Sequence, residues 1–272
     1  MINLVSDRNI LDKFVIEFTS ILEKYTKYVI VSGYVAISNG RVRGTEDIDI
    51  IIDKIPFSLF LKFLEDIYAS NFECIQSDDA LEIYNNYLIK KESIRFVYKG
   101  TILPNIELKF VKTEVDKYTL LKRTKLSLTG LDIYFASIES TIAYKEHYLS
   151  SDKDYEDALH LRLLYKEVLS LEEIKKIKLM IDKHLYNSLK DNSSFVYSTK
   201  RDKSHIDFIE KWVFFMKDNS FKIWKEEHSN FLDSQILTSI NFYQRLLKEE
   251  NGSKKIREVT GWNKKTPYWF EK

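Results

Sequence analysis

The sequence predicts an α+β fold, in which a mixed sheet with flanking helices is followed by a helical C-terminal domain. Short β-branched apolar runs alternate with helical patterns in the first part of the 272 residues, whereas the patterns after Ser137 are helical. The composition agrees, because 44% hydrophobic residues with only 7 Gly and 3 Pro indicate a packed protein whose regular elements have short connections.

The first expected element is a helix that Ser6 can cap and that continues to about Tyr25. Its apolar positions recur at helical spacing: Ile10, Leu11, Phe14, Val15, Phe18, Ile21 and Leu22. The run Tyr28–Val31 is short, apolar and β-branched, so it predicts the first strand.

A small-residue turn at Ser32-Gly33 follows this strand and leads into one or two helical turns over 34–39. A second strand is expected over 46–53. Pro56 can then open a helix that reaches Ile67, because proline is well suited to the first turn of a helix.

Three more strands complete the first part of the chain. Phe72–Ile75 is a short one, and Ile94–Tyr98 and Ile106–Val111 are joined around Gly100 and Pro104. The last two strands are therefore expected to form a hairpin with a longer loop.

The second part of the chain is expected to be helical. Ser137, Ser151 and Ser170 each precede a helical pattern and are suitable N-caps. Polar composition predicts a linker over 191–204 and a break over 251–255. The expected divisions are a first domain over 1–130, a helical domain over 131–250 and a tail over 251–272.

The tail mixes basic and aromatic residues: Lys254, Lys255, Arg257, Trp262, Lys264, Lys265, Tyr268, Trp269 and Phe270. Such a mixture can bind nucleic acid, because bases stack on aromatic rings and lysines pair with phosphates. The alternative is that the aromatic residues dock the tail onto the helical domain.

Charge and composition exclude several classes of function. The 42 basic and 41 acidic residues nearly balance, so a nucleic-acid partner would need a local patch. A single cysteine, Cys74, excludes an internal disulfide and a cysteine-rich zinc site. No apolar run approaches the roughly 20 residues that span a bilayer, so we expect a cytoplasmic protein with no membrane partner. Neither a Walker-type glycine loop nor a His-Glu-x-x-His motif is present.

Two acidic residues in the second strand are the first candidate site. Asp47 and Asp49 point to one strand face, with Cα atoms about 7 Å apart, while Ile48 and Ile50 point into the core. The two carboxylates repel each other unless a cation lies between them, and hard oxygen ligands favour Mg²⁺ or Mn²⁺. The alternative is an ordinary solvated strand face.

The Ser32-Gly33 turn is the second candidate. Small residues let the backbone approach a ligand closely, and the following helix start offers N–H groups to a phosphate. The length of the intervening segment allows the chain to return to a neighbouring strand, which would place the turn beside the carboxylates. The alternative is an ordinary strand-to-helix turn.

Taken together, Val31-Ser32-Gly33 and the later run Arg43-Gly44-Thr45-Glu46-Asp47-Ile48-Asp49 resemble the signature of the polymerase β nucleotidyltransferase superfamily. The closer likeness is to the branch that contains the AbiEii-type toxin nucleotidyltransferases and related uncharacterised proteins. The sequence departs from the pattern in one place, because Ser32-Gly33 stands where Gly-Gly or Gly-Ser is usual. The resemblance implies a polymerase β-like fold and a nucleotide site that includes Arg43 and Thr45.

The resemblance also implies a third carboxylate on a later strand, for which Glu107 is the best-placed candidate and Asp53 and Glu82 are the reserves. Strand alternation puts Glu107 and Lys109 on one face, as would be true of a solvated strand edge.

Lysines on early helices are implied to neutralise triphosphate oxygens, which assigns Lys145 and Lys153 to the nucleotide site. Asp154 and Asp157 are implied to orient these lysines. The alternative is that Asp154 simply lies in the first turn of a helix, where the dipole favours acids.

The implied activity is transfer of a nucleoside monophosphate from an NTP to a hydroxyl, with Mg²⁺ or Mn²⁺ bound by Asp47, Asp49 and Glu107. The acceptor would be an RNA, a protein or a small molecule. One alternative is a non-catalytic nucleotide- or nucleic-acid-binding module on the same fold. Another is the toxin of a toxin–antitoxin pair, which would add an antitoxin partner.

Overall fold

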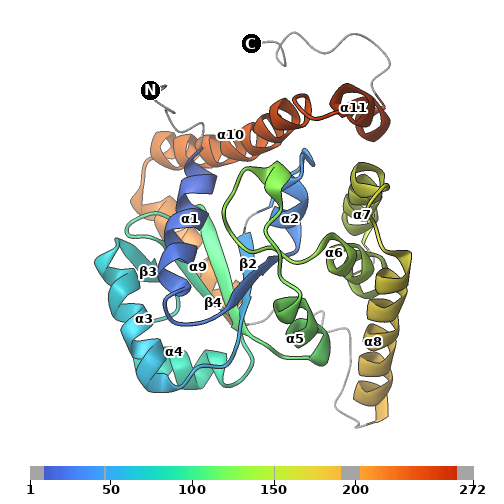
Figure 1. Ribbon diagram of the computed structural model, residues 1–272. Helices are drawn as coiled ribbons and strands as arrows, with labels where there is room; N and C mark the ends of the chain where they lie inside the picture. The colour runs from blue at the N-terminus through green and yellow to red at the C-terminus, as the bar shows by residue number, and fades with distance from the viewer. Residues whose placement is uncertain (1–8, 46, 150, 191–202, 262–272) are drawn as a thin grey trace.

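The computed structural model of the protein describes residues 9–45, 47–149, 151–190 and 203–261. Within these ranges a five-stranded mixed sheet is flanked by helices (Figure 1). The predicted α+β class is therefore confirmed. No helix in these four ranges is both long enough and apolar enough to cross a membrane.

The sheet has its only parallel pair of strands near its centre, among the residues described. The strands are β1 (Tyr28–Val31), β2 (Asp47–Ile52), β3 (Phe72–Cys74), β4 (Ile94–Tyr98) and β5 (Asn105–Phe110). They lie in the order β1-β2-β5-β4-β3, with β2 and β5 parallel and the other neighbours antiparallel. The predicted hairpin is confirmed, because β4 and β5 are antiparallel neighbours.

Helices precede, separate and follow the strands. They are α1 (Ile10–Leu22), α2 (Gly33–Ser38), α3 (Phe57–Ala69), α4 (Ala80–Ile83), α5 (Glu114–Leu121), α6 (Ile138–Tyr144), α7 (Asp152–Tyr165), α8 (Leu171–Lys190), α9 (Lys203–Asp218), α10 (Phe221–Leu246) and α11 (Gly252–Thr260). In Figure 1, α10 lies across the top of the molecule, and α6, α7 and α8 stand together at its right. Helix α10 contacts both α1 and α2.

The two faces of β2 have different environments. Ile48 and Ile50 are buried in the same hydrophobic core as Phe18 of α1. Because side chains alternate along a strand, Asp47 and Asp49 point to the opposite face. The predicted orientation of the two isoleucines into the core is confirmed.

The core continues from the first part of the chain into the second. Ile142 of α6, Ile177 of α8 and Phe208 of α9 belong to the same buried cluster as the residues of β2. The hydrophobic core is therefore continuous across the predicted boundary near residue 130. The division into domains stays a prediction.

Helix starts agree with the sequence except at α1. Ser137 and Ser151 cap α6 and α7 through their side-chain oxygens, and Pro56 precedes α3. Ser6 lies outside the described residues, and the cap of α1 is Asn9. The Asn9 side chain accepts a hydrogen bond from the backbone N–H of Asp12, so the helix begins at Ile10.

Two predicted breaks differ from the structure in their bounds. Residues 191–202 lie outside the described residues, but Ser204 belongs to α9 and its buried hydroxyl accepts a hydrogen bond from Arg95. The break over 251–255 is wrong, because α11 begins at Gly252. The connection between the two helices covers 247–251 and ends at Asn251 in the left-handed conformation (φ 61°), and a Cβ on Gly252 would overlap the Leu246 carbonyl oxygen.

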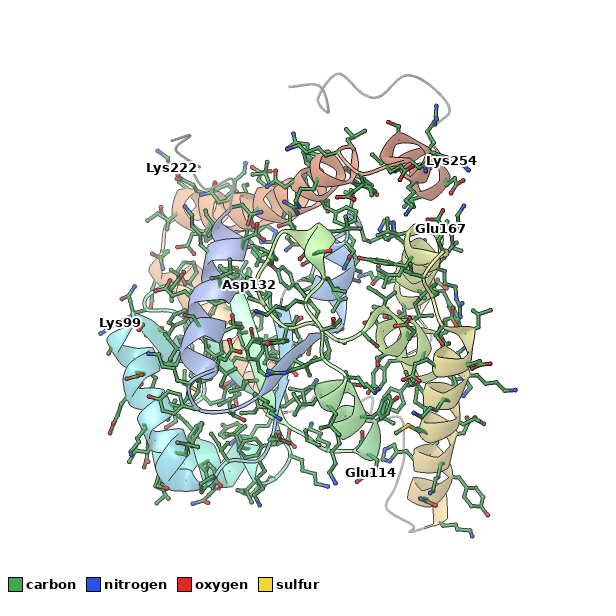
Figure 2. The ribbon with its side chains drawn as sticks, viewed as in Figure 1. Lys99, Glu114, Asp132, Glu167, Lys222 and Lys254 are labelled. Atoms are coloured by element: carbon green, nitrogen blue, oxygen red, sulfur yellow. The ribbon has the colours of Figure 1, made fainter. Side chains whose placement is uncertain are left out.

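Charged side chains cover the outside of the molecule (Figure 2). The labelled examples there are Lys99, Glu114, Asp132, Glu167, Lys222 and Lys254. Lys254, Lys255 and Arg257 of the predicted tail lie on α11, whereas its aromatic residues at 262 and 268–270 lie outside the described residues. The structure therefore leaves both interpretations of the tail as predictions.

Candidate active site

Three carboxylates gather on the face of the sheet opposite the α1 side. Asp47 and Asp49 are half-buried on β2, and Glu107 on the parallel neighbour β5 is the register partner of Asp49. The reserve candidates lie elsewhere, because Asp53 is exposed beyond the end of β2 and Glu82 is exposed on α4. Of the three candidates, Glu107 is the one that lies beside the acidic pair.

Two cationic side chains connect these acids. Arg95 of β4 places Nη1 3.1 Å from Asp47 Oδ2 and pairs through Nη2 with Glu107 Oε2. Lys109 of β5 places Nζ 3.4 Å from Asp49 Oδ1 and 3.9 Å from Glu107 Oε1. The cluster thus contains three potential negative charges and two positive charges.

Burial and charge shift the pKa values in this cluster. Burial, followed by the negative charge of Asp49, raises the pKa of Glu107 to about 6, although Arg95 and Lys109 oppose the rise. Burial alone would lower the pKa of Lys109, but the carboxylates of Asp49 and Glu107 outweigh it and raise the pKa. The ammonium form of Lys109 is therefore stabilised.

The donor chemistry of the cluster fits Mg²⁺ or Mn²⁺, since these ions prefer carboxylate oxygens. As it stands, however, no group of three acidic, histidine or cysteine side chains in the described ranges is arranged to hold a metal ion. Arg95 and Lys109 pair with the acids that would be the ligands. Metal binding at Asp49 would require Lys109 to move aside.

The Ser32-Gly33 turn lies beside the acids because Val31 is the register partner of Asp49. Ser32 has a φ of 64°, which is uncommon for a residue with a side chain and is typical of functional turns. A Cβ on Gly33 would lie 2.3 Å from Arg43 Nη2 and 2.9 Å from Thr45 Oγ1. A side chain at this position would displace the side chains of Arg43 and Thr45, and the four predicted nucleotide-site residues of the turn and the 41–45 segment lie together.

Helix α10 holds the 41–45 segment in place. The Gln235 side chain forms a pair of hydrogen bonds with the backbone of Thr45: Oε1 accepts from the N–H at 2.8 Å and Nε2 donates to the carbonyl at 2.7 Å. The Ser239 hydroxyl donates to the Arg41 carbonyl at 2.9 Å. The sequence offered no signal for these contacts.

A buried ionic cluster lies behind the same segment. Lys145 is 1% exposed, and its Nζ lies 2.8 Å from both Asp154 Oδ1 and Asp157 Oδ2. The fully buried Asp157 also lies 3.4 Å from Arg41 Nε and 3.5 Å from Arg43 Nε. This cluster joins α7 to the 41–45 segment, and its five charges offset one another's desolvation.

The predicted lysines differ in their surroundings. Lys145 is buried in the ionic cluster, whereas Lys153 is exposed at the start of α7. Asp154 holds Lys145 and also completes the capping box of α7 with Ser151. Although burial opposes it, these hydrogen bonds lower the pKa of Asp154. Both interpretations of Asp154, a first-turn acid and a partner of the lysine, are consistent with its contacts.

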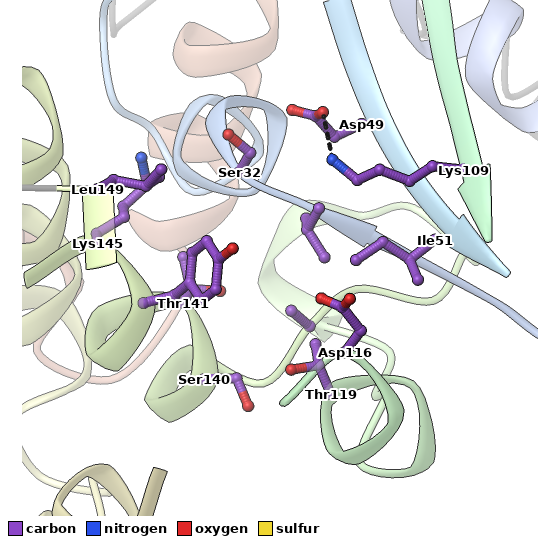
Figure 3. Close-up of a pocket in the computed structure, with 13 residues that line it drawn as sticks. Ser32, Asp49, Ile51, Lys109, Asp116, Thr119, Ser140, Thr141, Lys145 and Leu149 are labelled. Atoms are coloured by element: carbon purple, nitrogen blue, oxygen red, sulfur yellow. Dashed lines mark hydrogen bonds and ion pairs between the residues drawn. The ribbon is translucent and has the colours of Figure 1, made fainter. Parts of the chain in front are cut away.

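Two cavities border the acidic cluster from different sides. The smaller has a volume of about 200 Å³ and is lined by Ser32, Asp49, Lys109 and Lys145, among others (Figure 3). The larger has a volume of about 850 Å³ and reaches Asp47, with the 41–45 segment, Lys153 and side chains of α9 and α10 in its lining. A compact cavity therefore lies at Asp49 and a wider one at Asp47.

No protein-family model matches the chain, and no curated protein matches it either.

Proposed function

We propose that the protein is a metal-dependent nucleotidyltransferase, which moves a nucleoside monophosphate from an NTP to a hydroxyl of an acceptor. The observation that carries this proposal is the convergence of Asp47, Asp49 and Glu107 on adjacent strands beside the Ser32-Gly33 turn. This arrangement supplies acidic ligands and a closely approachable backbone at one place, as nucleotidyl transfer requires.

In this proposal Asp47 and Asp49 hold Mg²⁺ or Mn²⁺, and Glu107 completes the carboxylate set. The bound ion would act as a Lewis acid on the α-phosphate and lower the pKa of the acceptor hydroxyl. The acceptor oxygen forms a bond to the α-phosphorus, the bond to the β-phosphate oxygen breaks, and pyrophosphate leaves while the hydroxyl proton is lost to solvent.

The smaller cavity suits the phosphate end of the NTP. Its volume of about 200 Å³ lies below the range of about 300–1,000 Å³ that is usual for whole small-molecule ligands. Its lining combines Lys109 and Lys145 with the acids Asp49 and Asp116, and Ser32 contributes the turn. Lys109 would exchange its pairing with Asp49 for a phosphate oxygen when the metal binds.

The buried ionic cluster has a positioning role in this proposal. Asp157 contacts Arg41, Arg43 and Lys145 together, so it fixes the 41–45 segment relative to α6 and α7. Arg43 in turn packs against Gly33. Lys145 and Arg43 would therefore keep the phosphate-facing turn in one geometry.

Incubation of the pure protein with each α-labelled NTP, Mg²⁺ and either total RNA or total protein tests the proposal. Covalent label on a macromolecule, or on a small molecule resolved by chromatography, is the expected result. No label in any fraction with any NTP, with Mg²⁺ or Mn²⁺, would contradict it.

A non-catalytic nucleotide-binding module is the second candidate function. The observation that favours it is that Arg95 and Lys109 already pair with the three carboxylates. Such a module would bind NTP without transferring any label. An antitoxin partner remains a proposal that rests on the resemblance alone, and co-purification with the product of a neighbouring gene would test it.

A further inference from the structure

The larger cavity has an aromatic wall that α9 and α10 build together. Phe208, Trp212 and Met216 lie four residues apart on α9, so they share one face of that helix and all line the cavity. His228 and Phe231 of α10 line it from the other helix. The rings of Phe208 and Trp212 pack edge to face with centroids 5.7 Å apart, and those of Trp212 and His228 do so at 6.1 Å.

One polar atom in this wall has no hydrogen-bond partner in the described part of the chain. It is the buried Nδ1 of His228. A buried polar atom without a partner costs roughly 1–3 kcal/mol, and a ligand that bonded to it would recover that cost. The wall thus offers flat apolar faces together with one polar atom that can distinguish ligands.

The cavity lining also contains charged side chains. Arg41, Arg43 and Lys153 belong to the lining together with two acids, Glu156 and Asp47 of the acidic cluster. Phe208 connects the wall to that cluster, because its ring lies 5.2 Å from the guanidinium carbon of Arg95, which holds Asp47. A ligand with a flat ring and a phosphate would match this distribution.

We propose that this cavity binds a nucleobase, with Trp212 as the stacking surface and His228 as a determinant of which base is accepted. The volume of about 850 Å³ lies within the range usual for small-molecule ligands, and aromatic stacking is the usual way to hold a base. The inference rests on the proposed function, which places a nucleotide at Asp47. The base has two sources, the NTP itself or the terminal nucleotide of a nucleic-acid acceptor.

Substitution of Trp212 by Leu, Trp212 by Tyr and Trp224 by Leu tests the inference. Trp224 is the matched control, since it packs against Phe221 on α10 and does not line the cavity. Binding of each NTP with Mn²⁺, of a short single-stranded RNA and of inorganic tripolyphosphate is measured by calorimetry for every variant. Thermal melting confirms which variants are folded.

If the cavity holds the base of the NTP, Trp212→Leu should weaken NTP binding by roughly tenfold and leave tripolyphosphate binding unchanged. If the cavity holds the terminal base of the acceptor, Trp212→Leu should instead weaken RNA binding by the same factor. In either case Trp212→Tyr, which keeps an aromatic face, retains most of the affinity, and His228→Phe changes the order of preference among the four bases.

The inference would be overturned if Trp212→Leu bound NTP and RNA as tightly as Trp212→Tyr and Trp224→Leu do. It would also be overturned if Trp212→Leu and Trp224→Leu lost the same amount of affinity. These outcomes are distinguishable from failure of the proposed function. If the unaltered protein transfers label and Trp212→Leu binds NTP and RNA normally, the proposed function is supported and the base site is contradicted. If the protein binds bases through Trp212 and never transfers label, the base site is supported and the enzymatic function is contradicted.

Discussion

Asp49 on β2 and Glu107 on β5 are register partners in the parallel pair of strands, so their carboxylates share one face of the sheet. Two acids this close repel each other, and Lys109 relieves the repulsion by pairing with both. The protein therefore contains its own cation at the place where the proposed reaction needs a metal ion.

This relationship predicts that Lys109 competes with metal. Lys109→Met should tighten Mn²⁺ binding by roughly tenfold, because one positive charge near Asp49 and Glu107 is removed. Titration of Mn²⁺ followed by electron paramagnetic resonance measures the affinity. Lys99→Met, an exposed substitution away from the cluster, should leave the affinity unchanged (Figure 2). Weaker metal binding in Lys109→Met would show that the ammonium does not occupy the metal position.

The turn predicts a strong effect of a single methyl group. Gly33→Ala should lower the free energy of unfolding by about 1–3 kcal/mol and weaken nucleotide binding, because the new Cβ would displace the side chains of Arg43 and Thr45. Gly44→Ala is the matched control, since the nearest atom to its Cβ would be Gln235 Oε1 at 3.9 Å. Denaturant unfolding and NTP titration measure the two effects. Equal behaviour of both variants would contradict the role given to Gly33.

Helix α10 is predicted to control the geometry of the 41–45 segment. Gln235→Ala removes both hydrogen bonds to the Thr45 backbone, so we expect a loss of stability of about 1–3 kcal/mol and weaker NTP binding. Asp233→Ala, an exposed substitution on the same helix, should change neither quantity. Denaturant unfolding and NTP titration check this expectation. Unaltered NTP affinity in Gln235→Ala would show that α10 does not control the geometry of the nucleotide site.

Stability should also depend on pH through His160. Burial lowers the pKa of His160, whose Nε2 lies 2.8 Å from the Asn39 carbonyl oxygen. The unfolded chain therefore binds a proton more readily than the folded chain, so stability falls as the pH drops below about 6.5, the ordinary value for histidine. Melting curves between pH 8 and pH 5 should show this loss, and His160→Gln should reduce it. An identical pH dependence in both proteins would refute this assignment.

Local patterns predicted the strands and the caps of α6 and α7 because each depends on neighbouring residues, whereas the cap of α1 is Asn9 and not Ser6. Alternation alone placed Ile48 and Ile50 in the core and Asp47 and Asp49 on the other face. The sequence also put Glu107 and Lys109 on a common face, which proved to be the acidic face.

Contacts between distant segments could not be predicted in this way. Gln235 and Thr45 are 190 positions apart, and no periodic pattern connects them. Arg95 was missed for the same reason, because its ion pairs depend on the order of β2, β5 and β4 in the sheet. The aromatic wall of the larger cavity was also missed, since Trp212 and His228 read as ordinary helical residues until α9 and α10 pack together.

Transfer of label from an α-labelled NTP, compared between the protein and two asparagine variants, tests the central claim most directly. Asp49→Asn removes a proposed metal ligand, whereas Asp53→Asn changes an exposed carboxylate just beyond the end of the same strand. We predict that the unaltered protein and Asp53→Asn transfer label at equal rates with Mg²⁺, and that Asp49→Asn loses at least about 99% of the activity. Transfer by Asp49→Asn at the rate of the unaltered protein would contradict the assignment of the active site to Asp47, Asp49 and Glu107.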